Sequence, residues 1–375
     1  MAFNHPDLSS RRSPFTVDLK SLSAGYKVHA IYFAMIFSAL ILWGIGVYVL
    51  YRTVGGPDLA MSSRLSVFQT KMTRLLIVFF TVFSIVRTIQ FISMNHEKSL
   101  AGHLIHCVKS DPFWLPRSAL FGMIGAASFL YLQVNFMSVK TAIPVMQPFY
   151  FDDIARKMDY FIFLGNDPWV IFSKLYELPQ IMKLIDVTYT LWSTLIVGFW
   201  IYAFTTNRIS RQRRFQYIFA MILIWFVAGN VLATVLSSAG PCYYHLFGND
   251  PSYYAPLMAQ LGAVHDAVYI DAFSYQDVLL AMYDNPETRL GGISAAPSLH
   301  VGSSLILLMF FWKNKITRNL MILFNIIIFV GSIVLAWHYA VDGLIAAPVA
   351  LGCWLIAGKL TKKIEHKLAA KQQLT

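Results

Sequence analysis

Long apolar runs alternate with short polar and basic stretches along most of this chain. A helix needs about 20 mostly apolar residues to cross the hydrocarbon core of a membrane. About eight runs approach this length, over residues 28–51, 74–94, 118–136, 187–204, 215–237, 299–312, 319–337 and 341–358. The pattern therefore predicts an all-α, polytopic membrane protein.

The runs divide the chain into four regions. Residues 1–27 are a polar, cytoplasmic N-terminal segment, which should stay attached because the run that follows is too long for the core of a signal peptide. Residues 28–117 contain two additional N-terminal membrane helices with their loops. Residues 118–358 contain a core of six helices, and 359–375 form a basic cytoplasmic tail.

Two long segments, 137–186 and 238–298, lie on the same side of the membrane in an eight-helix arrangement. The other side receives the basic N-terminus, the stretch 207–214, the turn 313–318 and the basic tail. Because lysine and arginine accumulate on the cytoplasmic side, the two long segments should be extracytoplasmic. Aromatic, apolar and charged residues mix around a turn in the first of them, which predicts short helices at the membrane interface.

Composition agrees with a chain whose main solvent is lipid, since 57% of its residues are hydrophobic and only 13% are charged. The formal net charge of +11 would also suit a nucleic-acid-binding protein. However, lysine and arginine lie mostly in short gaps between apolar runs, and no RNA-binding motif occurs. We therefore interpret the charge as a topology signal and as contact with anionic lipid headgroups, and expect no nucleic-acid partner.

Two histidines occur where apolar runs meet the predicted extracytoplasmic surface. His300 opens the sixth run, in GGISAAPSLHVGSSL (291–305), and His338 follows the seventh, in LAWHYAVDG (335–343). The two runs form a hairpin with arms of similar length, so both histidines should reach the same surface. Asp342 is four residues after His338, and the two side chains share one face if the eighth helix begins there.

This arrangement fits phosphoryl transfer. A carboxylate one turn from an imidazole can accept its ring N–H and leave the other ring nitrogen basic, which suits a nucleophile paired with a second histidine as general acid. Pro297 fits a first helical turn, and Ser298 with the N–H groups that start the sixth helix fits a phosphate. The alternative is that each histidine is only a polar residue at a helix end.

The stretches SAAPSLHVGSS and WHYAVDG resemble the second and third signature motifs of the type 2 phosphatidic acid phosphatase superfamily. In particular they resemble its inositol phosphorylceramide synthase and sphingomyelin synthase branch. MDYFIFLGNDPWVIF (158–172), IDVTY (185–189) and AGPCYYHLFGNDPSYYAPLM (239–258) are similar to bacterial inositolphosphotransferase-like members. The resemblance covers about residues 118–358.

This resemblance implies a double displacement that needs neither a metal nor another cofactor. His338 would attack the lipid phosphate and form a phosphohistidine, and Asp342 would orient it. His300 would protonate the departing alkoxide and then deprotonate the incoming alcohol or water.

The chain departs from the phosphatase branch in its cations. That branch usually begins with KxxxxxxRP, whereas this chain has no Arg-Pro pair, and Gly331 and Ser332 stand where the third motif usually has Ser-Arg. A phosphate dianion needs such cations more than a phosphodiester does, so the chain is predicted to be a transferase that uses a diester. The candidate substrate-binding residues are Ser298, Arg289 as a substitute cation, Ser294 and Tyr243.

We therefore expect an integral membrane lipid phosphotransferase whose active site faces the extracytoplasmic side. The donor would be a phospholipid such as phosphatidylinositol, and the acceptor a lipid alcohol such as ceramide or diacylglycerol. One alternative is a lipid phosphatase that hydrolyses phosphatidate or a polyprenyl (pyro)phosphate. Another is a transporter or scaffold that keeps the fold without the reaction.

Overall fold

The structure is a computed structural model that describes residues 19–54, 114–284 and 292–373. Within these ranges the secondary structure is helical, and six helices are long and apolar enough to cross a membrane. This confirms the prediction of an all-α, polytopic membrane protein. The predicted helix at 74–94 and the candidate cation Arg289 lie outside the described residues.

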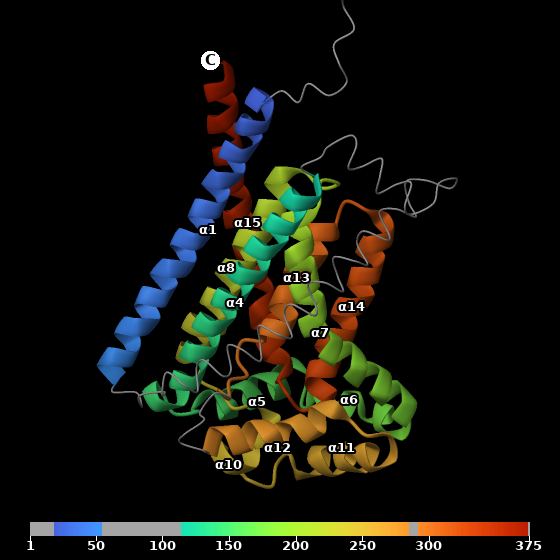
Figure 1. The fold of residues 1–375 in the computed structure, drawn as a ribbon. Coiled ribbons are helices and arrows are strands. Elements are labelled where there is room, and N and C mark those ends of the chain that lie inside the picture. The colour runs from blue at the N-terminus through green and yellow to red at the C-terminus, as the bar shows by residue number, and fades with distance from the viewer. Residues whose placement is uncertain (1–18, 55–113, 285–291, 374–375) are drawn as a thin grey trace, which may run out of the picture.

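The membrane helices form an elongated bundle in which α1 slants along the outside (Figure 1). Six of the seven are long enough by themselves, and α13 is a shorter apolar helix. They are α1 (Leu19–Val54), α4 (Trp114–Met146), α7 (Pro179–Thr205), α8 (Arg211–Phe226) with the π-helical turn η2 (Val227–Leu232) and α9 (Ala233–Val235), α13 (Leu299–Phe311), α14 (Lys315–Val334) and α15 (Ala340–Gln373).

Several helices continue past the apolar runs that predicted them. The third predicted helix ends at residue 136, but α4 continues to Met146, and α7 starts at Pro179. The outer segment predicted at 137–186 is therefore shorter, because both of its ends are wound into helices. The tail predicted at 359–375 is also helical, since α15 extends to Gln373.

Short helices form a layer across one end of the bundle, at the bottom of Figure 1. The start of α1 and the end of α15 lie at the opposite end. The outer layer consists of α5 (Phe151–Ile162), α6 (Pro168–Ile171), η1 (Ser173–Glu177), η3 (Pro241–Tyr243), α10 (Tyr244–Phe247), α11 (Ala255–Val268) and α12 (Asp271–Asp284). The two long segments of the sequence thus meet at one end, as predicted.

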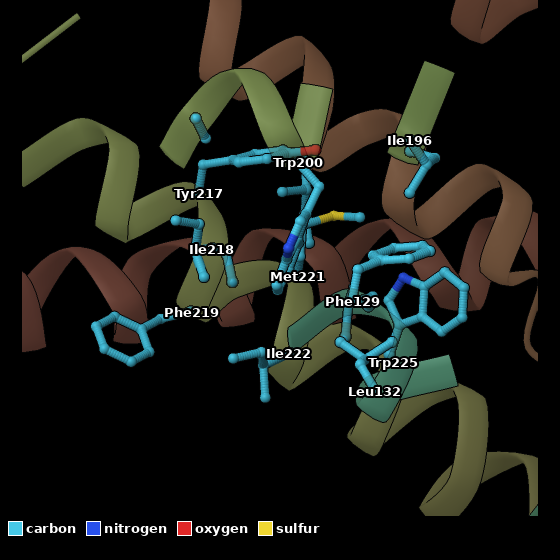
Figure 2. Close-up of a cluster of buried hydrophobic side chains, with 14 of the residues drawn as sticks. Phe129, Leu132, Ile196, Trp200, Tyr217, Ile218, Phe219, Met221, Ile222 and Trp225 are labelled. Atoms are coloured by element: carbon cyan, nitrogen blue, oxygen red, sulfur yellow. The ribbon is translucent and has the colours of Figure 1, made fainter. Parts of the chain in front are cut away.

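Aromatic and branched side chains of α4, α7 and α8 fill the middle of the bundle (Figure 2). Trp200 on α7 is fully buried, and its Nε1 donates a hydrogen bond to the backbone oxygen of Gly125 on α4 at 2.9 Å. A Cβ atom on Gly125 would lie 2.9 Å from the Phe204 ring, so the absence of a side chain lets α4 and α7 approach closely. This packing fixes the helices from which the site is built.

Candidate active site

His300 lies in the first turn of α13, on the side of the outer layer that faces the bundle. With 13 residues, α13 is only about 20 Å long, which is shorter than the hydrocarbon core of a membrane. The non-helical residues 292–298 descend into the protein to reach its start, and nearly all of them are buried. Their backbone is satisfied there, since Ala295 N–H donates to Ser238 at 2.8 Å and Ser298 N–H to Asp342 at 3.1 Å.

His338 lies in the loop between α14 and α15, two residues before Ala340 opens α15. The condition for a shared helix face, that the eighth helix begins at His338, is therefore not met. Asp342 instead lies in the first helical turn, reaches back and accepts the backbone N–H of Tyr339 through Oδ2 at 3.1 Å. The same Oδ2 lies 3.4 Å from Nδ1 of His338. The contact of Asp342 with the backbone at the start of α15 therefore places its carboxylate beside His338.

The hairpin of α13 and α14 joins the two histidines as predicted, with ring centroids 5.7 Å apart. His338 is 6% exposed and Asp342 is fully buried. Neither Nδ1 of His338 nor Oδ1 of Asp342 makes a hydrogen bond to a described residue, so the 3.4 Å contact is an electrostatic one. Hydrogen bonds between catalytic groups are often long until substrate binds. The three predicted catalytic residues thus form one cluster.

Two aromatic residues of α7 hold the ring of His300. The ring stacks on Tyr189 with centroids 4.5 Å apart, and Trp192 lies 4.1 Å away at a tilt. Trp192 is itself fixed, because its Nε1 donates to the hydroxyl of Ser303 on α13 at 3.0 Å. The sequence alone predicts no role for either residue, although Tyr189 ends the stretch IDVTY (185–189). Their spacing, i and i+3, is the signal that places both on one helix face.

Lys140 on α4 brings a cation to the site that the sequence analysis missed. Its side chain is half-buried, its ammonium lies 5.9 Å from the centre of the Phe136 ring, and it forms no ion pair with a described residue. The segment before His300 also touches this part of α4, since a Cβ atom on Gly292 would lie 2.5 Å from the Lys140 carbonyl. Gln147 and Pro148 follow Lys140 at the spacing of KxxxxxxRP. With glutamine in place of arginine, no Arg-Pro pair marks this lysine.

Ser332 occupies the position where the third motif usually has arginine, and it provides no charge. Its side chain is buried and its hydroxyl donates to the Phe329 carbonyl at 2.7 Å. Its backbone oxygen accepts the N–H of His338 at 2.9 Å. The neighbouring Gly331 packs against Ile185 and Tyr189. Ser332 and Gly331 thus bring no positive charge to the histidines, whereas Lys140 lies on the part of α4 that the segment before His300 touches.

The other predicted substrate-binding residues take different places. Ser298 is buried at the start of α13, where its hydroxyl accepts the Val301 N–H at 3.4 Å. Ser294 is half-buried on the segment before it. Tyr243 is buried within the outer layer and donates to the Gln276 carbonyl at 2.9 Å. Ser298 and Ser294 thus accompany His300, whereas Tyr243 holds two parts of the outer layer together.

The cluster can do acid–base and nucleophilic chemistry with its own side chains. Asp342 faces Nδ1 of His338, which leaves Nε2 as the nucleophilic atom. His300 is close enough to serve the same reacting group as acid or base. Among the described residues, no group of three or more histidine, cysteine, aspartate or glutamate side chains is placed to hold a metal ion.

A protein-family model described as PAP2 superfamily matches residues 128–356, which is more than half of the chain. The match contains α7, α8, α13 and α14 entirely, together with most of α4 and the start of α15. No curated protein and no solved structure matches the chain.

Proposed function

Because this chain belongs to the PAP2 superfamily of membrane phosphatases and phosphotransferases, we propose that it transfers a phospho-headgroup between lipids. The donor is a phospholipid with a phosphoinositol-like headgroup. The acceptor is a lipid alcohol such as ceramide or diacylglycerol. The observation that carries this proposal is that both histidines and Asp342 are present, whereas the arginines usual in the phosphatase branch are replaced by uncharged residues.

Phosphate monoesters and phosphodiesters differ in negative charge, and therefore in the number of cations that they need. A phosphate monoester carries nearly two negative charges at neutral pH and is bound best by several cations, above all by bidentate arginine. The described site offers Lys140, while Ser332 and Gln147 stand where two arginines are usual in the phosphatase branch. A phosphodiester carries about one negative charge, which one ammonium group can balance. This favours a phospholipid donor over a phosphatidate.

In the first half of the reaction, Nε2 of His338 attacks phosphorus and a P–N bond forms. The P–O bond to the donor's glycerol lipid breaks, and His300 gives its proton to the departing alkoxide, which leaves as diacylglycerol. Asp342 stabilises the positive charge on the His338 ring as the bond forms. Lys140 and the N–H groups at the start of α13 hold the non-bridging oxygens.

In the second half, the acceptor hydroxyl attacks the phosphorus of the phosphohistidine. His300, now neutral, takes the hydroxyl proton, the P–N bond breaks, and His338 is regenerated. The product is a new phosphodiester lipid, and charge and protons balance over the cycle. No step calls for a metal ion.

We also propose that the outer layer and the site face the extracytoplasmic side. The basic stretch at 207–214 and the turn at 313–318 join helices at the end of the bundle opposite this layer. Positive charge of this kind marks the cytoplasmic side.

A transfer assay tests the proposal. The purified full chain in liposomes receives a panel of phospholipid donors, among them phosphatidylinositol, with labelled ceramide or labelled diacylglycerol, in the presence of a metal chelator. We expect a labelled phosphodiester lipid that does not form with H338A. Product only after a divalent metal is restored would contradict metal independence.

The same assay separates the alternatives. Release of inorganic phosphate from phosphatidate or a polyprenyl phosphate, without a new lipid, would identify a phosphatase and overturn the transferase proposal. Wild-type and H338A proteins that are equally inactive on every donor would instead favour a transporter or scaffold.

A further inference from the structure

Two buried carboxylates of α5, Asp152 and Asp159, bind backbone near the segments that carry the two histidines; these histidine loops are residues 292–298, which lead to His300, and residues 335–341, which contain His338. Asp152 and Asp159 lie seven residues apart on the buried face of the helix and are each 1% exposed. Neither forms a salt bridge with a described residue. A carboxylate buried without a cation costs free energy unless hydrogen bonds satisfy it. Three of the six groups that donate to these two carboxylates come from residues 339–341, directly after His338, and the other three come from residues 238–240.

Asp159 caps the helix that follows His338. Its Oδ2 accepts the backbone N–H of Ala340 and its Oδ1 that of Val341, both at 2.7 Å. These N–H groups open α15 and have no partner within the helix, so a carboxylate there is favoured by hydrogen bonding and by the helix dipole. Ala340 and Val341 lie between His338 and Asp342. The cap therefore fixes the short piece of backbone that sets the distance between those two side chains.

Asp152 holds a neighbouring strip of backbone and the residue after His338. Its carboxylate accepts the N–H of Ala239 at 2.8 Å and of Gly240 at 2.9 Å, the hydroxyl of Ser238 at 2.8 Å, and the hydroxyl of Tyr339 at 3.0 Å. All four donors belong to segments that are distant from α5 in sequence. Asp152 thus joins three parts of the chain at one carboxylate.

The strip 238–240 touches both histidine loops. Ser238 accepts the N–H of Ala295, which belongs to the segment leading to His300. Gly240 has φ +97°, and a Cβ atom there would lie 2.6 Å from the Trp337 carbonyl beside His338. Asp152 is therefore linked to the segment before His300 through Ser238. It is linked to the residues beside His338 through Gly240 and Tyr339.

We infer that Asp152 and Asp159 are positioning residues of the catalytic cluster, through which the outer-layer helix α5 sets the relative placement of His300, His338 and Asp342. This inference rests on the proposed function for its chemistry. Neither carboxylate contacts a histidine, and neither is expected to touch the phosphate. Their effect is geometric, and misplacement of catalytic groups by about 1 Å can cost around a hundredfold in rate.

The test compares Asp159→Asn, Asp159→Ala and Asp152→Asn in the full chain at pH 8. Asparagine keeps one acceptor oxygen, whereas alanine removes both. We expect each variant to have a kcat about tenfold or more below that of the wild type, with Asp159→Ala lower than Asp159→Asn. KM should stay within about twofold of the wild-type value. The matched control is Asp153→Asn on the same helix, because Asp153 bonds Tyr244 and Asn249 in the outer layer and no residue of the histidine loops.

Orthovanadate provides a readout that needs no lipid substrate, since it mimics the five-coordinate phosphorus of the transition state. It should raise the unfolding temperature of the wild-type and Asp153→Asn proteins, fail to do so in His338→Ala, and do so less in the Asp159 and Asp152 variants. If vanadate stabilises the wild type while no lipid is turned over, the proposed substrates are wrong and the positioning role is judged by vanadate alone.

The inference is overturned if Asp159→Ala and Asp152→Asn keep both kcat and the vanadate response within about twofold of wild type. Failure of all three variants to fold, with Asp153→Asn intact, would assign the carboxylates to folding alone and equally overturn it. A wild-type protein with neither turnover nor a vanadate response would remove the proposed function and this inference together.

Discussion

Oδ2 of Asp342 lies 3.4 Å from Nδ1 of His338. Nδ1 of His338 makes no hydrogen bond to a described residue, and the same Oδ2 already accepts the N–H of Tyr339. The start of α15 thus sets the direction from which Asp342 approaches His338, and in the proposed reaction the carboxylate would move closer as positive charge develops on the imidazole ring.

Asp342→Asn should therefore lower kcat about a hundredfold or more, because an amide can present a donor to Nδ1 and favour the wrong tautomer. Asp277→Asn is the matched control, since Asp277 is exposed on α12. Turnover of a labelled phospholipid donor measures both variants. Equal rates for the two would show that the His338 ring does not need Asp342.

Tyr189 and Trp192 should position His300 by ring contact alone. The Tyr189 hydroxyl is buried and has no hydrogen-bond partner among the described residues, so Tyr189→Phe keeps the stacking face. We expect Tyr189→Phe to retain much more activity than Tyr189→Ala, whose cavity lets the imidazole ring rotate. The comparison of kcat in the two variants checks this. A similar loss in both would assign the contribution to the hydroxyl instead.

Lys140→Ala should reduce kcat/KM about ten- to a hundredfold, with partial recovery in Lys140→Arg, because either cation can balance a phosphodiester. Lys157→Ala on α5 provides the control, since Lys157 is exposed in the outer layer. The measurement is initial rate against donor concentration in liposomes. A normal rate in Lys140→Ala would leave the helix N-terminus of α13 as the main phosphate contact.

Asp159 should make stability depend on pH. Burial, together with the nearby carboxylates of Asp342 and Asp167, raises the pKa of Asp159 to about 7, although two backbone N–H groups oppose this shift. The folded state thus holds this proton more tightly than the unfolded chain. The resulting stability is complete below about pH 4 and is lost as the pH rises through about 7.

The change in unfolding free energy is at most about 1.4 kcal/mol for each pH unit in that window. Wild-type protein in detergent should therefore lose more thermal stability between pH 5 and pH 8 than Asp159→Asn does. Parallel unfolding curves for the two proteins at all pH values would contradict the pKa shift.

The proposed orientation predicts which surface positions label from outside. Single cysteines at Tyr275 and Ile316, both exposed, are placed in a chain without its three native cysteines. An impermeant maleimide should react with the cysteine at 275 in intact cells, and with that at 316 only after permeabilisation. The reverse result would place the histidines on the cytoplasmic side.

The sequence predicted the histidine cluster because its parts lie in a simple hairpin. His300 and His338 are separated by two apolar helices of similar length, so helix rise alone brings them to one surface. The contact between His338 and Asp342 depends instead on where α15 begins, two residues after His338. Helix starts are poorly defined by apolar runs, since caps and not hydrophobicity determine them.

The residues that the sequence analysis missed are held by contacts between distant segments. Lys140 belongs to a polar extension of α4 that continues beyond the apolar run, so its position near His300 follows from how α4 and the segment 292–298 pack. Asp152 and Asp159 lie in an amphipathic outer helix whose charges look solvent-exposed by composition. Their burial becomes visible only when α5 is placed across the start of α15.

The 6% exposure of His338 has a consequence for the fate of a phosphohistidine. If the proposed phosphohistidine forms there, the outer layer would limit the supply of water to it. A lipid alcohol that reaches the site from the bilayer would then compete with water for the phosphorus according to its concentration in the membrane, not in the bulk solution. The degree to which the outer layer excludes water would then set the ratio of transfer to a lipid alcohol over hydrolysis of the intermediate.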